Sequence, residues 1–132
     1  MKPVGTFKAS TTLGDRIQQA IDCRRKYSPP RIPIVLEHAH STKRPLVQIA
    51  RSQFLVPPEL RVGEFMYKIR KSINMPAAIA VYLMVDDCTT IPSKTLGEYY
   101  EEARDPDGWL YLVWAEESTF GHVVAEQGCE VI

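Results

Sequence analysis

Two histidines are the side chains of this sequence whose spacing best suits a metal ion. His38 and His40 lie two residues apart, so on a strand both would point to one face and could bind the same ion. No third ligand lies near them in sequence, and a surface pair at the end of a strand is the simpler interpretation. The sequence shows no nucleophile–base pair, Gly-rich phosphate loop or carboxylate pair at a recognisable spacing. We therefore expect no enzymatic activity, no metal site and no other cofactor.

The three cysteines, Cys23, Cys88 and Cys129, are odd in number and show no CxxC spacing. This pattern favours reduced thiols in a cytosolic protein. Cys129 begins the final residues CEVI, a loose match to the C-a-a-X prenylation pattern in which Glu130 occupies an aliphatic position. Prenylation of Cys129 is one interpretation of the tail, and a disposable propeptide is the favoured one.

Charges are distributed unevenly along the chain, although its formal net charge is zero. Residues 1–73 contain 14 Lys and Arg against 5 Asp and Glu, whereas residues 74–132 contain 2 against 11. The basic half could attract acidic peptides or anionic headgroups, or the two halves could neutralise each other in the fold. No aromatic and glycine-rich signature accompanies the basic residues, so we expect no nucleic-acid partner.

These residues must be positioned by a single domain. A chain of 132 residues with 45% hydrophobic and 24% charged residues has ordinary globular composition and can bury a sizeable core. No apolar run approaches the roughly 18 residues that cross a bilayer, and the first residues lack the continuous apolar stretch of a signal peptide. We therefore expect a cytoplasmic protein.

Apolar spacing predicts the helices, and runs of β-branched or continuous apolar residues predict the strands. Pro33 favours a strand start or an edge position, whereas the run AIAVYLMV from Ala78 favours a central strand. The predicted elements are, in order, a helix over 13–26, strands over 31–37 and 46–56, a helix over 62–73, a strand over 78–85, a short helix over 95–103 and a strand over 109–114.

Two strands, a packed helix and two more strands predict an α+β fold with its helix on one face of the sheet, a β-grasp arrangement as in ubiquitin. An N-terminal helical extension would occupy residues 1–30 and the ubiquitin-like β-grasp domain residues 31–121. Residues 122–132 would form a C-terminal tail that is removed as a propeptide.

Four sequence blocks occur in the order and spacing of a known family. They are RIPIVLE from Arg31, FLVPPELRVGEF from Phe54 with IRKSI following, DPDGWLYLVW from Asp105, and STFG from Ser118. Over about residues 7–121 the chain resembles the autophagy-related ubiquitin-like modifiers, the family of microtubule-associated light chain three and the GABA-receptor-associated protein. The resemblance implies a ubiquitin-like core, conjugated through a C-terminal glycine to phosphatidylethanolamine and used as a docking platform in autophagy.

Gly121 is the position that the resemblance implies for processing and lipid conjugation, with Phe120 as the recognition residue before it. A glycine carboxyl group can enter narrow enzyme clefts in extended form because no Cβ obstructs it. The family's cysteine protease would remove the residues HVVAEQGCEVI, and ubiquitin-like E1 and E2 enzymes would join Gly121 to phosphatidylethanolamine. The lipidated form would then reside on the autophagosome membrane.

The resemblance also implies a docking surface for the short acidic-aromatic motifs of autophagy receptors. If Val47–Val56 lies at the sheet edge, it can accept an extended peptide as an added strand. The matching positions are Cys23, Pro33, Val35, Leu55 and Trp109 for an aromatic side chain, Phe54, Val56, Pro57, Leu60 and Phe65 for an aliphatic one, and Arg31, Arg51 and Lys68 for an electrostatic rim. We expect the peptide to present its aromatic and aliphatic side chains, three positions apart, on one face. Core packing and a solvated basic face are the alternatives.

The sequence departs from the family pattern at several positions. Cys23 stands where the pattern has a larger aliphatic residue, Gln53 stands where it usually has lysine, the loop from His40 to Ile49 is expanded, and YSPPR carries an extra residue. We therefore expect a shifted docking specificity. The alternative function is a soluble ubiquitin-like interaction domain that is never lipidated and binds partner proteins or microtubules through its basic N-terminal helix.

Overall fold

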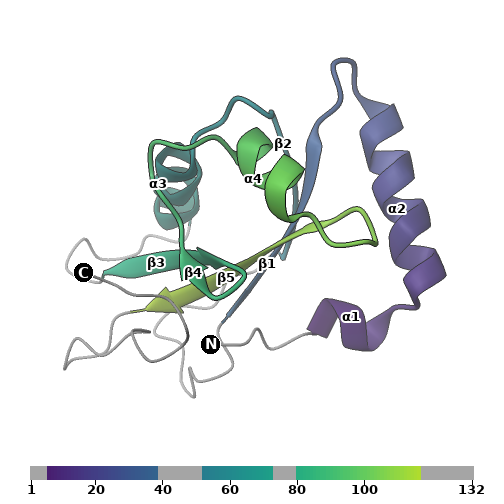
Figure 1. Cartoon of the computed structure of the whole chain (residues 1–132), viewed down its shortest axis with the longest axis horizontal. Coiled ribbons are helices and arrows are strands. Elements are labelled where there is room, and N and C mark those ends of the chain that lie inside the picture. Colours follow the sequence, from purple (N-terminus) through teal and green to yellow (C-terminus); the bar gives the residue numbers. More distant parts are fainter. Residues whose placement is uncertain (1–5, 39–51, 73–79, 117–132) are drawn as a thin grey trace.

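The protein is seen in a computed structural model that describes residues 6–38, 52–72 and 80–116. Helices and strands follow in the order α1 (Thr6–Ser10), α2 (Leu13–Lys26), β1 (Ile32–His38), β2 (Gln53–Val56), α3 (Val62–Ser72), β3 (Val81–Val85), β4 (Cys88–Thr89), α4 (Leu96–Ala103) and β5 (Leu110–Glu116). Figure 1 shows α3 and α4 on one side of the sheet and α2 on the other. None of the helices in these ranges is long and apolar enough to cross a membrane.

The strands form one mixed sheet in the order β2-β1-β5-β3-β4 (Figure 1). β1 and β5 pair in parallel at its centre, with Ile34 opposite Leu110, and every other pairing is antiparallel. Strands that are parallel neighbours need a long crossover, and here the chain from β1 to β5 supplies it with the remaining strands and helices. This is the predicted ubiquitin-like β-grasp, which the structure confirms.

Strand alternation divides the interior into two layers of side chains. In β1, Ile32, Ile34 and Leu36 join the large core beneath α3 and α4, together with Phe65 of α3. Val35 points to the other face, where it packs with Phe7, Ala20 and Trp109 beneath the N-terminal helices. Six of the seven β1 residues are buried, which explains why this strand lacks the polar alternation of a solvated one.

Local capping explains where the helices start. The Thr12 hydroxyl accepts a hydrogen bond from the Asp15 N–H at the start of α2, and the Thr95 hydroxyl accepts one from the Glu98 N–H at the start of α4. α2 ends with three cations in its last turn, where they complement the helix dipole. At the start of α3, the Glu64 carboxylate accepts a bond from the Arg61 N–H.

Two short elements were not predicted. α1 is a five-residue helix in the segment before α2, and Phe7 anchors it by packing edge-on against Trp109 at 5.1 Å. β4 pairs with β3 through a two-residue turn in which Asp86 and Asp87 have φ values of 51° and 65°. Such a turn matches the twist of a hairpin, but aspartate carries only a weak signal for it compared with Asn-Gly. Both elements contain too few residues to show a helical or strand period in the sequence.

The predicted boundaries agree closely for the other elements. Pro33 is the second residue of β1, which is an interior strand, so the strand-start interpretation was the correct one. Of the predicted strand over residues 46–56, the structure shows β2 at Gln53–Val56, and residues 39–51 lie outside the described ranges. The expectation of reduced thiols is wrong for Cys88, which is disulfide-bonded, whereas Cys23 is free. The number and spacing of cysteines in the sequence do not indicate which of them form disulfides in the fold.

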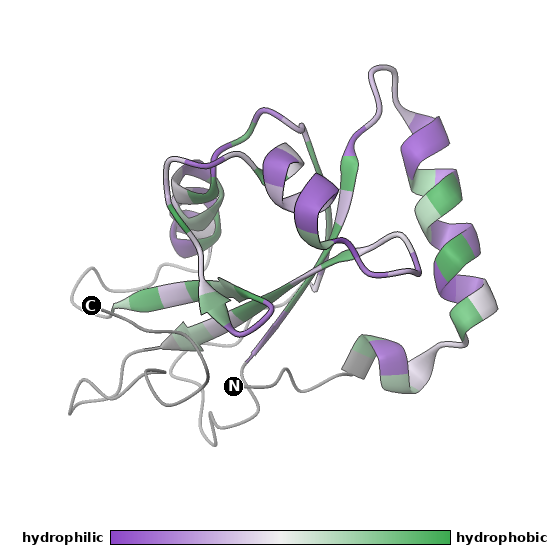
Figure 2. Ribbon diagram, in the orientation of Figure 1, coloured by the Kyte–Doolittle hydropathy of each residue, from purple (hydrophilic) through white to green (hydrophobic). Residues whose placement is uncertain are grey.

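The uneven charge distribution is partly neutralised by contacts between the two halves of the chain. Lys8 Nζ lies 2.9 Å from the Asp105 carboxylate, and Arg16 Nε lies 3.0 Å from that of Asp107. Figure 2 shows hydrophilic and hydrophobic residues interspersed along α2, while the strands are mainly hydrophobic. The basic N-terminal helices are therefore held on the sheet partly by acidic residues of the loop before β5.

Candidate peptide-binding site

β2 is an edge strand, as the predicted docking surface requires. Within the described part of the chain it pairs only with β1, from Ile32 opposite Val56 to Val35 opposite Gln53. An edge strand presents backbone N–H and C=O groups on its outer side, and an extended peptide can pair with them. The backbone of Gln53–Val56 therefore offers a short template for an added strand.

The side chains of β2 alternate between the two faces of the sheet. Leu55 faces the α2 side and lines a cavity with Cys23 and Trp109. Phe54 and Val56 face the opposite side and pack in the core beneath α3 and α4, although atoms of Phe54 also line the first pocket. The expectation that both peptide side chains lie on one face is therefore wrong. Residues three positions apart on a strand point to opposite faces, which suits pockets that flank an edge strand.

The first pocket has a volume of about 440 Å³. Its lining residues are Cys23, Lys26, Tyr27, Gln53, Phe54, Leu55 and Trp109. Three of the five predicted residues thus line one cavity, while Val35 (0% exposed) and Pro33 are buried beneath it. Lys26, Tyr27 and Gln53 were missed as residues of the first pocket, and Phe54 was predicted for the second pocket. Lys26 and Tyr27 lie at the end of α2, four residues or fewer after Cys23, which puts them near the same wall.

Cys23 forms the α2 wall of the first pocket. It is a free, half-buried thiol, and burial raises its pKa, although the nearby ammonium group of Lys26 acts in the opposite direction. The side chain is therefore a neutral thiol at physiological pH and packs as a small hydrophobic group. A cysteine occupies less volume than a branched aliphatic residue, so this wall leaves more room for an aromatic side chain.

Two of the residues predicted for the second pocket belong to the core. Phe65 is 2% exposed and Val56 is 6% exposed, so both fit the core-packing alternative. Phe54 packs edge-on against Phe65 with ring centroids 5.5 Å apart, and Phe54 and Leu60 are half-buried at the edge of this core. Phe54, Leu60 and the half-buried Pro57 are the members whose surfaces a ligand could reach.

The predicted basic rim is spread over several elements. Arg31 precedes β1, and its guanidinium lies 5.1 Å from the centre of the Tyr27 ring. Lys68 is exposed on α3. Arg51 lies outside the described residues. The cation that lines the first pocket is instead Lys26, whose ammonium group lies 5.8 Å from the centre of the Tyr27 ring.

A buried carboxylate holds the N-terminal helices in position beside the first pocket. The side chain of Asp107 is 0% exposed and accepts hydrogen bonds from Arg16 Nε at 3.0 Å, the Tyr111 hydroxyl at 2.6 Å and the Trp109 N–H at 2.9 Å. Trp109 Nε1 donates in turn to the Arg16 carbonyl at 2.9 Å. We call Arg16, Asp107, Trp109 and Tyr111 the latch. The latch joins α2, which carries Cys23, to Trp109 on the other side of the pocket.

Two further features show how closely α2 approaches the loop before β5. Gly108 has a φ of +90°, which favours glycine, and a Cβ there would lie 2.9 Å from Ala20 Cβ. Burial raises the pKa of the Tyr111 hydroxyl, and its bond to Asp107 acts in the same direction, so Tyr111 remains a donor. The turn Asp-Pro-Asp-Gly could be recognised in the sequence. The sequence did not indicate that its second aspartate, Asp107, pairs with Arg16.

Several predicted residues lie outside the described ranges. Phe120 and Gly121, the predicted processing and conjugation residues, are among them, as are His40 and Cys129. His38, at the end of β1, is half-buried. The residues that the structure does describe contain no group of three His, Cys, Asp or Glu side chains placed to hold a metal ion.

A mixed β-grasp sheet with helices added at the N-terminus defines a ubiquitin-like fold. The family model described as "Autophagy protein Atg8 ubiquitin like" matches residues 15–121. The chain therefore belongs to the Atg8 family of ubiquitin-like autophagy proteins, as the sequence resemblance predicts.

Individual relatives agree with this assignment. The chain is 36% identical over 115 residues to autophagy-related protein 8e of Arabidopsis thaliana, covering 87% of this chain and 92% of that one. It is 36% identical over 117 residues to autophagy-related protein 8 of Mycosarcoma maydis, covering 89% and 97%. The crystal structure of Trypanosoma brucei ATG8 superposes with a TM-score of 0.77 at 31% identity, covering 87% of this chain and 97% of that one.

Proposed function

We propose that this protein is a ubiquitin-like modifier of autophagy, processed to expose Gly121 and conjugated there to phosphatidylethanolamine. Membership of the Atg8 family supports this, and the family match ends at Gly121. The chain would serve as substrate of the family's cysteine protease and of ubiquitin-like E1 and E2 enzymes, with no catalytic activity of its own. It would be cytoplasmic before conjugation and associated with the autophagosome membrane afterwards.

The lipidated protein would recruit autophagy receptors through short peptide motifs. The observation that carries this proposal is the position of β2 at the edge of the sheet. The first pocket, of about 440 Å³, lies on one face of this strand, and the half-buried Phe54 and Leu60 lie on the other. An extended peptide with an aromatic residue, two spacers and an aliphatic residue places these two side chains on opposite faces. Its backbone would pair with Gln53–Val56 while the side chains enter the two pockets.

Intact mass measured in cells that contain the conjugation machinery tests the lipidation step. We expect a product that ends at Gly121 and a second, lipid-bearing form. Gly121→Ala should abolish both, because the added methyl group obstructs the narrow clefts that the terminal residue must enter. A full-length chain of 132 residues as the sole species would instead support the unlipidated interaction domain, with partner proteins or microtubules as ligands.

Cys129→Ser is the matched control for the prenylation alternative, which requires that thiol. Under our proposal the serine variant keeps its membrane association, since residue 129 is discarded with the tail. If the serine variant leaves the membrane fraction while Gly121→Ala stays in it, the anchor is a prenyl group and the proposed conjugation is wrong.

A further inference from the structure

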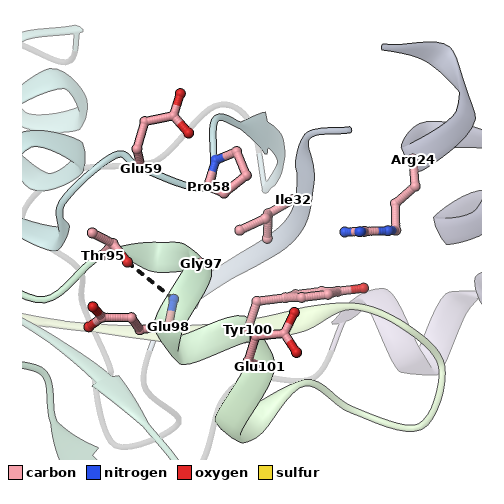
Figure 3. A pocket seen from close by; sticks show the side chains of 9 residues that line it. All are labelled: Arg24, Ile32, Pro58, Glu59, Thr95, Gly97, Glu98, Tyr100 and Glu101. Atoms are coloured by element: carbon pink, nitrogen blue, oxygen red, sulfur yellow. Dashed lines mark hydrogen bonds between the residues drawn. The ribbon is translucent and has the colours of Figure 1, made fainter. Parts of the chain in front are cut away.

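A second cavity, of about 490 Å³, lies between the C-terminal turn of α2 and helix α4 (Figure 3). Its floor consists of the buried Ile32 and Tyr100 together with the half-buried Pro58. Three exposed glutamates, Glu59, Glu98 and Glu101, surround this floor. We call it the acidic pocket. It shares no lining residue with the first pocket and lies outside the surface described above.

The walls of the acidic pocket are fixed by backbone hydrogen bonds. Gly97 N–H donates to the Pro58 carbonyl at 2.8 Å, and Leu96 N–H donates to the Leu60 carbonyl at 2.8 Å. The approach is close enough that a Cβ on Gly97 would lie 2.7 Å from the Pro58 oxygen. The Tyr100 hydroxyl donates to the Gly108 carbonyl at 2.8 Å, which fixes the ring. A ligand would therefore meet a preformed site and spend little free energy on ordering it.

The charge of the lining residues favours a cation. Within the described residues, the carboxylates of Glu59 and Glu98 form no ion pair or hydrogen bond, and Glu101, 76% exposed, lies 3.5 Å from Arg104. The lining contains one cation, Arg24, against these three carboxylates. A ligand with a positive charge would thus be attracted to the rim, and one with a negative charge would be repelled.

The floor of the acidic pocket already binds guanidinium groups from the chain itself. Arg24 reaches from α2 over the Tyr100 ring, with its guanidinium carbon 5.1 Å from the ring centre (Figure 3). The guanidinium of Arg104 lies 5.4 Å from the same centre. The face of an aromatic ring attracts cations, and apolar groups pack well against the aliphatic stem of lysine or arginine. Ile32 and Pro58 provide such an apolar surface beside the ring.

We propose that the acidic pocket binds a lysine or arginine side chain in a peptide segment of a partner protein. The aliphatic stem of that side chain packs on Ile32 and Pro58, and its charged end reaches the carboxylates of Glu59 and Glu98. The first pocket carries Lys26 and attracts acidic segments, so the two pockets select opposite charges. This binding requires neither lipid conjugation at Gly121 nor an aromatic residue in the first pocket.

A titration monitored by the backbone amide signals of the full chain tests the proposal. The probe is acetyl-Leu-Arg-amide, compared with acetyl-Leu-citrulline-amide, which has nearly the same shape without the charge, and with acetyl-Leu-Glu-amide. We expect the arginine probe to shift the signals of Thr95, Gly97 and Glu98 in a saturable manner. The citrulline probe should bind more weakly, and the glutamate probe should leave these signals unchanged.

Matched variants separate the pocket from general charge effects. Glu59→Gln combined with Glu98→Gln should weaken binding of the arginine probe by about threefold, since each exposed ion pair typically contributes only a few tenths of a kcal/mol. Both residues are exposed, so the fold is retained. Asp15→Asn removes one negative charge from the exposed first turn of α2 and should leave binding unchanged.

Three results would overturn the proposal. The first is equal binding of the arginine and glutamate probes. The second is wild-type affinity in the double glutamine variant. The third is a shift of the same amide signals with protein concentration alone, which would identify a second copy of the chain as the occupant. Because no outcome depends on Gly121 or Leu55, failure here is distinct from failure of the proposed modifier function.

Discussion

The sequence resemblance implies that Cys23 and Gln53 are the positions at which the first pocket departs from the family pattern. Cys23 provides a small apolar wall, and Gln53 supplies an amide where the family usually has a lysine. A wider pocket favours a large aromatic ligand side chain, and an amide attracts acidic flanking residues less strongly than an ammonium group does. At the scale of single residues, we therefore expect binding to depend more on the depth of the pocket than on its charge.

Leu55→Ala tests this expectation directly. The substitution removes a wall of the first pocket, and burial of an aromatic side chain typically contributes a few kcal/mol. We expect affinity for a peptide with the aromatic-x-x-aliphatic pattern to fall about tenfold or more, equivalent to about 1.4 kcal/mol. Arg51→Ala is the comparison, and it should mainly slow association and reduce the salt dependence. Calorimetric titration of a folded Leu55→Ala protein that shows unchanged affinity would remove this surface as the docking site.

Alkylation of Cys23 reports occupancy of the first pocket. Because burial raises the pKa of its thiol, Cys23 should react slowly with iodoacetamide near pH 7 and faster as the pH rises. A bound aromatic peptide should slow the reaction further by covering the sulfur. Mass spectrometry of the modified chain measures this rate at residue 23, with Cys23→Ser as the blank. A rate that saturating peptide does not change would place the peptide elsewhere.

At the scale of elements, the position of α2 depends on the latch. The Arg16–Asp107 ion pair is almost entirely buried, and Asp107 also accepts bonds from Tyr111 and Trp109. Removal of one partner from such an arrangement leaves buried groups without their bonds, and this costs more than an exposed ion pair would contribute. The latch therefore couples the stability of the N-terminal helices to the shape of the first pocket.

Asp107→Ala should lower the free energy of unfolding by about 3 kcal/mol or more, the usual loss when one member of a buried ion pair is removed. Asp107→Asn should cost less, since an amide oxygen can still accept some of the bonds. Urea denaturation measures both values. Lys8→Ala, which removes the more exposed pair with Asp105, is the control and should cost less than 1 kcal/mol. Equal losses for Asp107→Ala and Lys8→Ala would show that the latch has no special role.

At the scale of the whole molecule, the charge division along the sequence becomes a set of contacts between the two ends of the chain. Lys8 and Arg16 come from the basic half, and Asp105 and Asp107 come from the acidic half. The charged residues that line the two pockets also differ in sign. Lys26 lines the first pocket, and three glutamates line the acidic pocket. A net charge of zero therefore conceals two surfaces of opposite preference.

Acid should weaken the attachment of the N-terminal segment. Burial alone would raise the pKa of Asp105, but hydrogen bonds from Lys8 and from the Asp107 N–H outweigh it and lower this pKa below 3.8. A carboxyl group with a depressed pKa in the folded state adds stability above pH 3.8, and this stability is lost as the pH falls through the folded-state value. The difference in unfolding free energy between wild type and Asp105→Asn should therefore shrink from pH 6 to pH 2.5. Urea titrations at both pH values check this, and a difference independent of pH would contradict it.

Much of the fold was predictable because its signals are local. Helical spacing located α2 and α3, and prolines ended several elements. The resemblance to the family also identified three of the residues that line the first pocket, Cys23, Leu55 and Trp109. α1 and β4 escaped prediction, since a five-residue helix anchored by Phe7 and a two-residue strand contain too few residues to show a period.

The sequence by itself determined the class of fold, the family and the three residues Cys23, Leu55 and Trp109 that line one cavity, because each is encoded in a local pattern or motif. Only the tertiary structure decided which face each residue of β2 occupies relative to the helices. It also brought Arg16 to a carboxylate 91 positions away and assembled the acidic pocket from α2, β1, the loop after β2 and α4. Ion pairs and pockets between distant segments arise from chain topology, and no window of neighbouring residues contains that information.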